Sequence, residues 1–346
     1  MTAETLGDGG AASFDEGRLT PLQRAQHFLH AHPTAIPAIV LIIALVGFSV
    51  AVGERFLHPF NFSLILQQVT IIGIVAVAQT LIILTAGIDL SVGAMLVLSS
   101  VVMGRLAVVH GVPAPLAIMA GFAVGALCGA INGALITRLR MPPFIVTLGT
   151  WNIFFAINLW YSRSETIRAQ DIEATAPLLQ FFGTGVDVLG LRLTYGAILM
   201  LLLVAAVWYA LNWTRWGRHL HATGDDPEAA NLAGIRTGRV LMSVYIAAGM
   251  ICALAGWVII GRIGSASPLA GETANLDSIT AVVMGGTSLF GGRGSIVGTL
   301  FGALIVGVFR NGLALGGVNV LWQEFAVGVL IILAVAADQW LRRAST

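Results

Sequence analysis

Residues 56–88 read FLHPFNFSLILQQVTIIGIVAVAQTLIILTAGI, without one Asp, Glu or Arg. A helix needs about 20 mainly apolar residues to cross the hydrocarbon core of a bilayer. Five further uncharged stretches meet this length: 25–53, 106–137, 141–162, 193–214 and 240–261. The sequence therefore predicts at least six transmembrane helices.

The composition of the whole chain agrees with this. Of 346 residues, 10% are charged and 57% are hydrophobic, whereas ordinary soluble domains are about 25% charged. This excess of apolar residues predicts that membrane lipid surrounds most of the chain. The net charge of +1 gives no basic surface for nucleic acid. All 18 basic residues are Arg. A phosphate-binding loop of the Walker A type requires a Lys, so any ATP hydrolysis must reside in another subunit.

We predict an all-α, polytopic membrane protein in which residues 36–340 form about ten transmembrane helices with an inverted repeat. Four of the segments, near 90–109, 274–290, 294–310 and 319–337, are short or bounded by a charge, so re-entrant or tilted pieces are the alternatives to full spans there. Residues 1–35 are expected to be a cytoplasmic tail with a short interfacial helix that begins at Thr20 and Pro21. Residues 341–346 form a second cytoplasmic tail. Because the first 35 residues lack a basic start, we expect no cleaved signal peptide.

The distribution of Arg residues predicts the orientation. With ten alternating segments and both termini inside, eleven Arg residues fall on the cytoplasmic side and five on the outer side. Cytoplasmic loops of membrane proteins carry such an excess. The sequence therefore predicts a multi-pass protein with both termini in the cytoplasm.

Glycine patterns indicate close helix packing and an internal duplication. Residues 124–130 (VGALCGA) match residues 297–303 (VGTLFGA), and segments five apart in an alternating chain run in opposite directions. Inverted repeats of this kind build many transporters. Glycines four residues apart, as at 121, 125, 129 and 133, let helix backbones approach closely in lipid.

The connection 214–239 contains a predicted short helix at about 226–234. Asp226 is a good N-cap, Pro227 suits the first helical position and Gly234 suits the end. The helix contains the pattern EAAxxxG, formed by Glu228, Ala229, Ala230 and Gly234. We predict a helix of about two turns on the cytoplasmic side.

Four stretches carry a resemblance to a known family: GIDLSVG (87–93), INGALITRLRMPPFIVTLGT (131–150), RWGRHLHATGDDPEAANLAGI (215–235) and ITAVVMGGTSLFGGRGSIVGTLFGALIVGV (279–308). They resemble the monosaccharide permeases of bacterial ABC importers, of the ribose, xylose and fructose type, and are most similar to a fructose permease. The resemblance covers residues 36–340. It implies a permease in the bacterial inner membrane that translocates a sugar into the cytoplasm by alternating access.

The same resemblance implies three partners: a second copy of the permease, a cytoplasmic ATP-binding subunit and a periplasmic sugar-binding protein. EAAxxxG is the signature of the coupling helix that docks on the ATPase in such permeases. The classical signature continues with apolar positions, but Arg236 interrupts it here, so the assignment ends at Gly234.

Asp89, in GIDLSVG, has two interpretations. It can be a gate that changes contacts between transport states, because ionisable groups in membranes are costly and often functional. Alternatively, Asp89 or Ser91 caps the next helix, and the carboxylate lies at the inner surface. Arg310 and Glu324 are expected to pair, as a structural neutralisation.

A sugar path requires amides and aromatic faces rather than charge. The candidates are Gln67, Gln68, Gln79, Trp151, Asn152 and Asn158, although amides in membranes also bond neighbouring helices. We expect no enzyme active site and no cofactor. We also expect no metal site, because the histidines lack the Cys or carboxylate neighbours of a typical zinc site: His27, His30, His32, His219 and His221.

Two other functions fit parts of the sequence. A branched-chain amino acid permease would share the inverted repeat. An ion-coupled secondary transporter usually carries ionisable residues within its spans, and six of the ten segments here have none.

Overall fold

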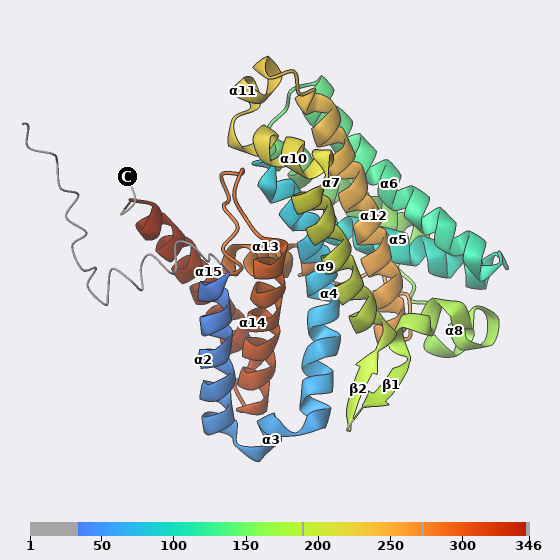
Figure 1. Ribbon diagram of the computed structural model, residues 1–346. Helices are drawn as coiled ribbons and strands as arrows, with labels where there is room; N and C mark the ends of the chain where they lie inside the picture. The colour runs from blue at the N-terminus through green and yellow to red at the C-terminus, as the bar shows by residue number, and fades with distance from the viewer. Residues whose placement is uncertain (1–33, 189, 272, 344–346) are drawn as a thin grey trace, which may run out of the picture.

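The computed structural model describes residues 34–188, 190–271 and 273–343 (Figure 1). The predicted interfacial helix and the first three histidines lie outside these residues. Within them, eight helices are long and apolar enough to cross a membrane, and two further apolar helices are shorter. The predicted all-α, polytopic fold is therefore confirmed.

Each of the ten predicted segments corresponds to one apolar helix, and the loops carry short additional elements. The elements are α2 (Ala35–Val52), α3 (Glu54–Leu57), α4 (Pro59–Leu84), α5 (Val92–Gly104) with a π-helical end η1 (Arg105–Val109), α6 (Ala114–Arg138), α7 (Pro143–Ser162), α8 (Ala169–Thr175), the 3-10 helix η2 (Pro177–Gly183), β1 (Gly185–Val188), β2 (Leu191–Thr194), α9 (Tyr195–Trp213), α10 (Arg215–Asp225), α11 (Pro227–Leu232), α12 (Thr237–Ile263), α13 (Ala274–Met284), α14 (Ile296–Leu315) and α15 (Val320–Arg343). The strands β1 and β2 form an antiparallel hairpin.

Helix α13 does not extend as far as the segment 274–290 predicts. It has eleven residues and is about 16 Å long, about half of the bilayer core. The chain leaves the helix at residue 285, and Gly286, Gly291 and Gly292 then adopt positive φ angles, which favour glycine. Helix α13 therefore cannot cross the membrane by itself.

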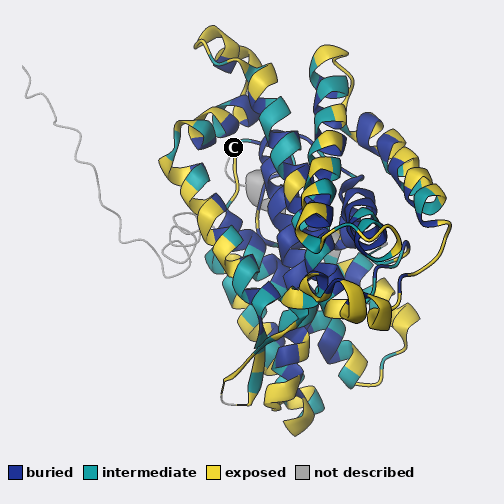
Figure 2. Cartoon of the chain, turned by 90° about the vertical axis from the view of Figure 1, so that its right-hand side faces the viewer, coloured by how far each residue is buried: buried dark blue, intermediate teal, exposed yellow. Residues whose placement is uncertain are grey.

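The helices form an inner group and an outer group. In Figure 2 the buried residues gather in the centre of the molecule, and the exposed residues lie on the peripheral helices and loops. In an apolar 18-residue stretch of α4, 78% is buried inside the protein, whereas the buried share of the corresponding stretch of α2 is 11%. In a bilayer an exposed apolar helix such as α2 faces lipid without cost.

The packing of the helices supports the predicted inverted repeat. Helix α4 packs against α14 and α13, and α12 packs correspondingly against α6 and α5. Helix α5 also packs against α6, as α13 does against α14. If α4–α7 are taken as equivalent to α12–α15, each of these packed pairs has a counterpart among the others. Helices α4 and α12 run in opposite directions (Figure 1), as an inverted repeat requires.

The repeated glycines lie at close helix contacts, as expected. A side chain at Gly125 or Gly129 would collide with the backbone of α12, at Gly249 and Tyr245. In the matching stretch, a side chain at Gly302 would collide with α13. The first stretch therefore packs against α12 and the second against α13, and these two helices are not equivalent in the repeat. The match between the two sequences is thus explained by close helix packing more directly than by duplication.

The two ends of the molecule differ. Helices α10 and α11 lie at one end, and α2 runs away from this end whereas α15 runs toward it (Figure 1). Helix α8 and the β1–β2 hairpin lie at the other end. The described start and end of the chain therefore lie on the same side as the predicted coupling helix.

Candidate transport site and coupling surface

The connection 85–91 between α4 and α5 folds into the interior and buries Asp89. The carboxylate oxygen Oδ1 accepts hydrogen bonds from the backbone N–H and the hydroxyl of Ser91, both at 2.6 Å. Asn132 of α6 donates to the Ser91 hydroxyl at 2.9 Å and, at 3.4 Å, to the other carboxylate oxygen. Asp89, Ser91 and Asn132 are each 0% exposed.

Both interpretations of Asp89 stay open. Ser91 is the N-cap residue of α5, as the second interpretation expects, and the Asp89 carboxylate is buried inside the protein. Because the carboxylate is removed from water, burial raises the pKa of Asp89 to about 6, although the hydrogen bonds from Ser91 and Asn132 oppose this effect.

Gln79, a candidate for the sugar path, binds the Asp89 backbone instead. With its amide oriented to match its neighbours, it donates to the Asp89 carbonyl oxygen at 3.2 Å and accepts from the Asp89 N–H at 3.3 Å. Gln79 is 0% exposed. Its amide therefore satisfies the backbone of an irregular connection that has no helical partners of its own.

A cavity lies beside the first turns of α5. Its volume is about 170 Å³, below the range of about 300–1,000 Å³ that most small-molecule sites span. The lining residues come from α5, α7 and the connection before α13: Gly93, Ala94, Val97, Trp151, Asn152, Phe155, Pro268, Leu269, Ala270 and Gly271. Two of the six path candidates, Trp151 and Asn152, thus line the same cavity.

The remaining path candidates lie elsewhere. The Asn158 amide donates to the Pro268 carbonyl oxygen at 2.8 Å and thereby holds a wall of the cavity. Gln67 lines a separate, smaller hollow with Arg262. The side-chain oxygen of Gln68 is buried with no hydrogen-bond partner among the described residues.

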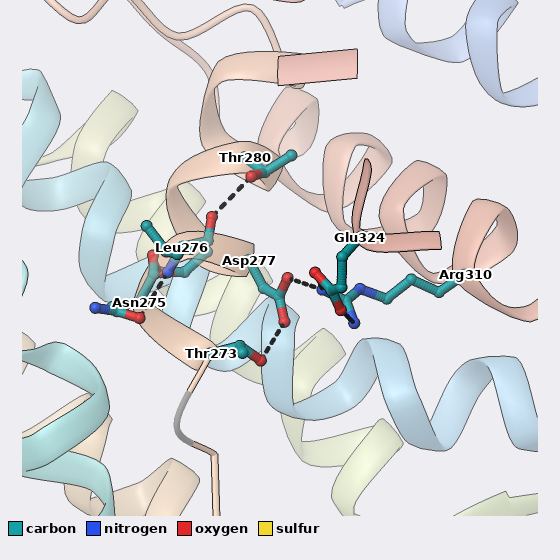
Figure 3. Close-up of polar contacts among 8 residues, drawn as sticks. Thr273, Asn275, Leu276, Asp277, Thr280, Arg310 and Glu324 are labelled. Carbon is teal, nitrogen blue, oxygen red and sulfur yellow. Dashed lines mark hydrogen bonds and ion pairs between the residues drawn. The ribbon is translucent and has the colours of Figure 1, made fainter. Parts of the chain in front are cut away.

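A charged cluster joins the helices α13, α14 and α15 (Figure 3). The predicted pair is present, with Arg310 Nη1 at 3.0 Å from Glu324 Oε1. Arg310 Nη2 also lies 2.7 Å from Asp277 Oδ1, and the Thr273 hydroxyl donates to Asp277 at 3.2 Å. Sequence reasoning missed Asp277, which it treated only as a charge at the edge of a segment.

Helix α11 has well-formed ends. The Asp226 carboxylate accepts from the N–H groups of Glu228 and Ala229, at 2.9 and 3.0 Å. At the other end, Gly234 has a φ of 85°, and the N–H of Ile235 donates to the Ala230 carbonyl oxygen at 3.0 Å. An N-cap and a glycine C-cap together fix this short helix without much packing.

Helix α11 presents apolar surface outside the bundle. Leu232 is 91% exposed, and Glu228 and Ala229 are exposed beside it, whereas Ala230 is buried. Figure 1 shows α10 and α11 projecting from one end of the molecule. An exposed Leu on a rigid, projecting helix suits contact with another protein.

These features describe a polytopic α-helical membrane protein with a small open cavity and a projecting helical arm. A family model described as "Branched-chain amino acid transport system / permease component" matches residues 61–335. The chain belongs to this family of ABC permeases. No solved structure matches it.

Similar proteins with curated names are sugar import permeases. The chain is 59% identical to the fructose import permease protein of Rhizobium meliloti, over 96% of this chain and 92% of that one. It is 42% identical to the ribose import permease protein of Bacillus subtilis, over 92% and 96%, and 36% identical to the galactose/methyl galactoside import permease protein of Escherichia coli K12, over 86% and 92%. The predicted resemblance to ABC monosaccharide permeases is confirmed.

Proposed function

We propose that this protein is the membrane subunit of an ATP-driven importer that moves fructose from the periplasm to the cytoplasm by alternating access. The 59% identity to a fructose import permease over nearly the whole chain carries this proposal. The cavity beside Trp151 and Asn152 supports it, because an aromatic face and an amide are suited to a neutral, hydroxyl-rich solute.

Uptake measurements test the substrate. Labelled fructose, ribose and xylose are supplied to cells that lack the gene and to the same cells with the gene restored. We expect fructose uptake to be lost and recovered. Recovery of ribose or xylose uptake alone would change the sugar, and no change for any of the three would overturn the sugar assignment.

The sugar path is proposed to pass through the cavity between α5 and α7. Helix α5 begins at its edge, with Gly93 and Ala94 in the lining, so the positive end of a helix dipole is close to the hydroxyl groups of a bound sugar. Trp151 is partly buried and Asn152 is exposed. Both residues line the cavity.

Asp89 and Ser91 are proposed to form a gate at the start of α5. Asn132 Oδ1 and the Tyr245 hydroxyl are buried nearby without a hydrogen-bond partner among the described residues. A side chain at Gly87 would lie 2.9 Å from that hydroxyl. Because unpaired buried polar groups are costly, a second arrangement of the connection 85–91 that pairs them is close in free energy.

Helix α11 is proposed to be the coupling helix. Its coupling residues are the caps and the EAAxxxG pattern: Asp226, Pro227, Glu228, Ala229, Ala230 and Gly234. A cytoplasmic ATP-binding subunit would dock on its exposed side. The two caps make the helix rigid, so it can transmit a displacement instead of unfolding. Leu232, 91% exposed, would enter a groove of the ATPase.

The orientation is tested by labelling Leu232→Cys from either side of the membrane. The two native cysteines are buried, so the background reaction with an impermeant maleimide is expected to be small. We expect labelling in inside-out vesicles and not in right-side-out ones. Labelling from the periplasmic side would overturn the cytoplasmic position of α11 and with it the coupling role.

The other proposed partners are a second copy of this chain and a periplasmic sugar-binding protein. Helix α8 and the β1–β2 hairpin lie at the end opposite α11 (Figure 1), where the binding protein would deliver sugar. In this arrangement both chain ends are cytoplasmic. Affinity for sugar would reside mainly in the binding protein, which fits the small number of polar groups in the cavity.

A branched-chain amino acid permease is the second candidate, because the matching family model carries that description. Competition with labelled fructose uptake separates the two. Unlabelled fructose should compete and leucine should not. An ion-coupled transporter would instead lose uptake on collapse of the ion gradient while ATP is maintained.

A further inference from the structure

A contact between three backbone segments joins the α10–α11 arm to the membrane bundle. It consists of Leu84 at the end of α4, Gly224 in the last turn of α10 and Gly292 in the connection 285–295, and we call it the glycine junction. The N–H of Gly292 donates to the Leu84 carbonyl oxygen at 3.0 Å. A Cβ on Gly224 would collide with that oxygen and would lie 2.9 Å from the Gly292 nitrogen.

His221 binds α10 to the same junction. Its Nδ1 atom lies 3.0 Å from the Gly292 carbonyl oxygen. A carbonyl oxygen only accepts hydrogen bonds, so Nδ1 must carry the proton in this contact. His219, on the same helix, is exposed, and its side chain makes no hydrogen bond or ion pair within the described part of the chain.

The segments that meet at the junction lead to the proposed gate and to α13. Leu84 directly precedes the connection 85–91, which contains Asp89. Gly292 lies between the short helix α13 and α14. The φ angles of Gly291 and Gly292 are 84° and 71°, a backbone conformation that fixes the turn and that other residues rarely adopt.

We propose that the glycine junction transmits motion of the α10–α11 arm to both connections, and that His221 is the positioning residue that holds α10 to it. This inference rests on the proposed function, because it assumes an ATPase on α11. The contact is backbone against backbone, so no side-chain rotation can absorb a shift of α10. Displacement of the arm therefore displaces Leu84 and Gly292 together.

The test uses the transporter reconstituted with its ATPase and binding protein, and compares His221→Leu, His221→Asn and His219→Leu. Three quantities are measured: ATPase retained on purification, ATP hydrolysis, and sugar imported per ATP hydrolysed. His221→Leu should retain the ATPase and hydrolyse ATP, but import at least about tenfold less sugar per ATP. His221→Asn should stay within about twofold of wild type, because its amide N–H can replace Nδ1–H. His219→Leu should match wild type.

Two results would overturn the inference: full coupling in His221→Leu, or equal loss in His221→Leu and His221→Asn. If His221→Leu does not fold, His221→Ala takes its place, since it removes the imidazole without adding bulk. Glu228→Arg separates this inference from the proposed function. If Glu228→Arg loses the ATPase while His221→Leu stays coupled, only the junction is wrong. If Glu228→Arg leaves ATPase binding and transport unchanged, the coupling role of α11 fails.

Discussion

Two buried carboxylates at the starts of the helices α5 and α13 are held in different ways. Asp89, before α5, is bound by neutral donors from Ser91 and Asn132. Asp277, in the first turn of α13, is bound by the guanidinium of Arg310, which also binds Glu324 of α15. The halves of the molecule therefore share their helix packing and differ in their charge. We infer that the ionic cluster fixes α13, whereas the connection before α5 is free to rearrange.

The largest effect is expected from breaking the ionic cluster. Arg310→Gln leaves two carboxylates without their cation. The side chains of Arg310 and Asp277 are 24% and 10% exposed, so we expect a cost below that of a fully buried ion pair, about 3–5 kcal/mol. We expect a strong loss of folded protein and a lower Tm in detergent. Arg239→Gln, at an exposed position, is the control. An Arg310→Gln protein with the wild-type Tm would contradict the fixed role of α13.

Breaking the other carboxylate should affect transport and not folding. Asp89→Asn keeps an oxygen that can accept from Ser91 but removes the charge, and its amide N–H₂ then faces the amide donor of Asn132. We expect uptake to be abolished at normal expression. Unchanged uptake would discard the gate.

Changing the lining of the cavity beside α5 should have an intermediate effect on the rate of uptake. Trp151→Ala removes an aromatic face from its lining, so we expect the rate of uptake to fall about tenfold with little change in Tm. Trp160→Ala, on the same helix but 78% exposed, is the matched control. Equal effects of the two substitutions would show that Trp151 supports only general packing.

A smaller effect concerns stability as a function of pH. The pKa of Asp89, about 6 in the folded protein, lies above the ordinary aspartate value of 3.8 because the carboxylate is buried, so ionisation of this group favours the unfolded state. Wild type should therefore lose stability relative to Asp89→Asn as the pH rises from about 4 to 6, and the difference should stay constant above that. If the difference in Tm between wild type and Asp89→Asn does not depend on pH, the carboxylate of Asp89 is not buried among uncharged donors as described.

Local rules predicted the elements well, but not the contacts between them. Uncharged runs located six of the ten apolar helices because the length of a span is set by the bilayer. Asp226, Pro227 and Gly234 predicted the ends of α11 because caps act within one turn. The end of α13 was missed because the glycines at 285 and 286 also fit a membrane helix.

The site contacts depend on tertiary packing. Asp277 and Arg310 are 33 residues apart, and Asn132 reaches Ser91 across 41, so no local pattern relates them. Gln79 and Asn158 have the composition of a sugar path, but packing assigns them to backbone groups. Trp151 and Asn152 could be proposed for the path from residue type alone, whereas their position beside α5 required the structure.

The most direct test of the account is sugar-stimulated ATP hydrolysis by the reconstituted transporter, with wild type and Glu228→Arg compared. Glu228 is exposed in the first turn of α11, so the substitution reverses a surface charge without disturbing the core. We predict that fructose-loaded binding protein stimulates hydrolysis and import in wild type, and that Glu228→Arg loses both the stimulation and the import. Normal stimulated hydrolysis and normal import by Glu228→Arg would contradict the coupling of this permease through α11.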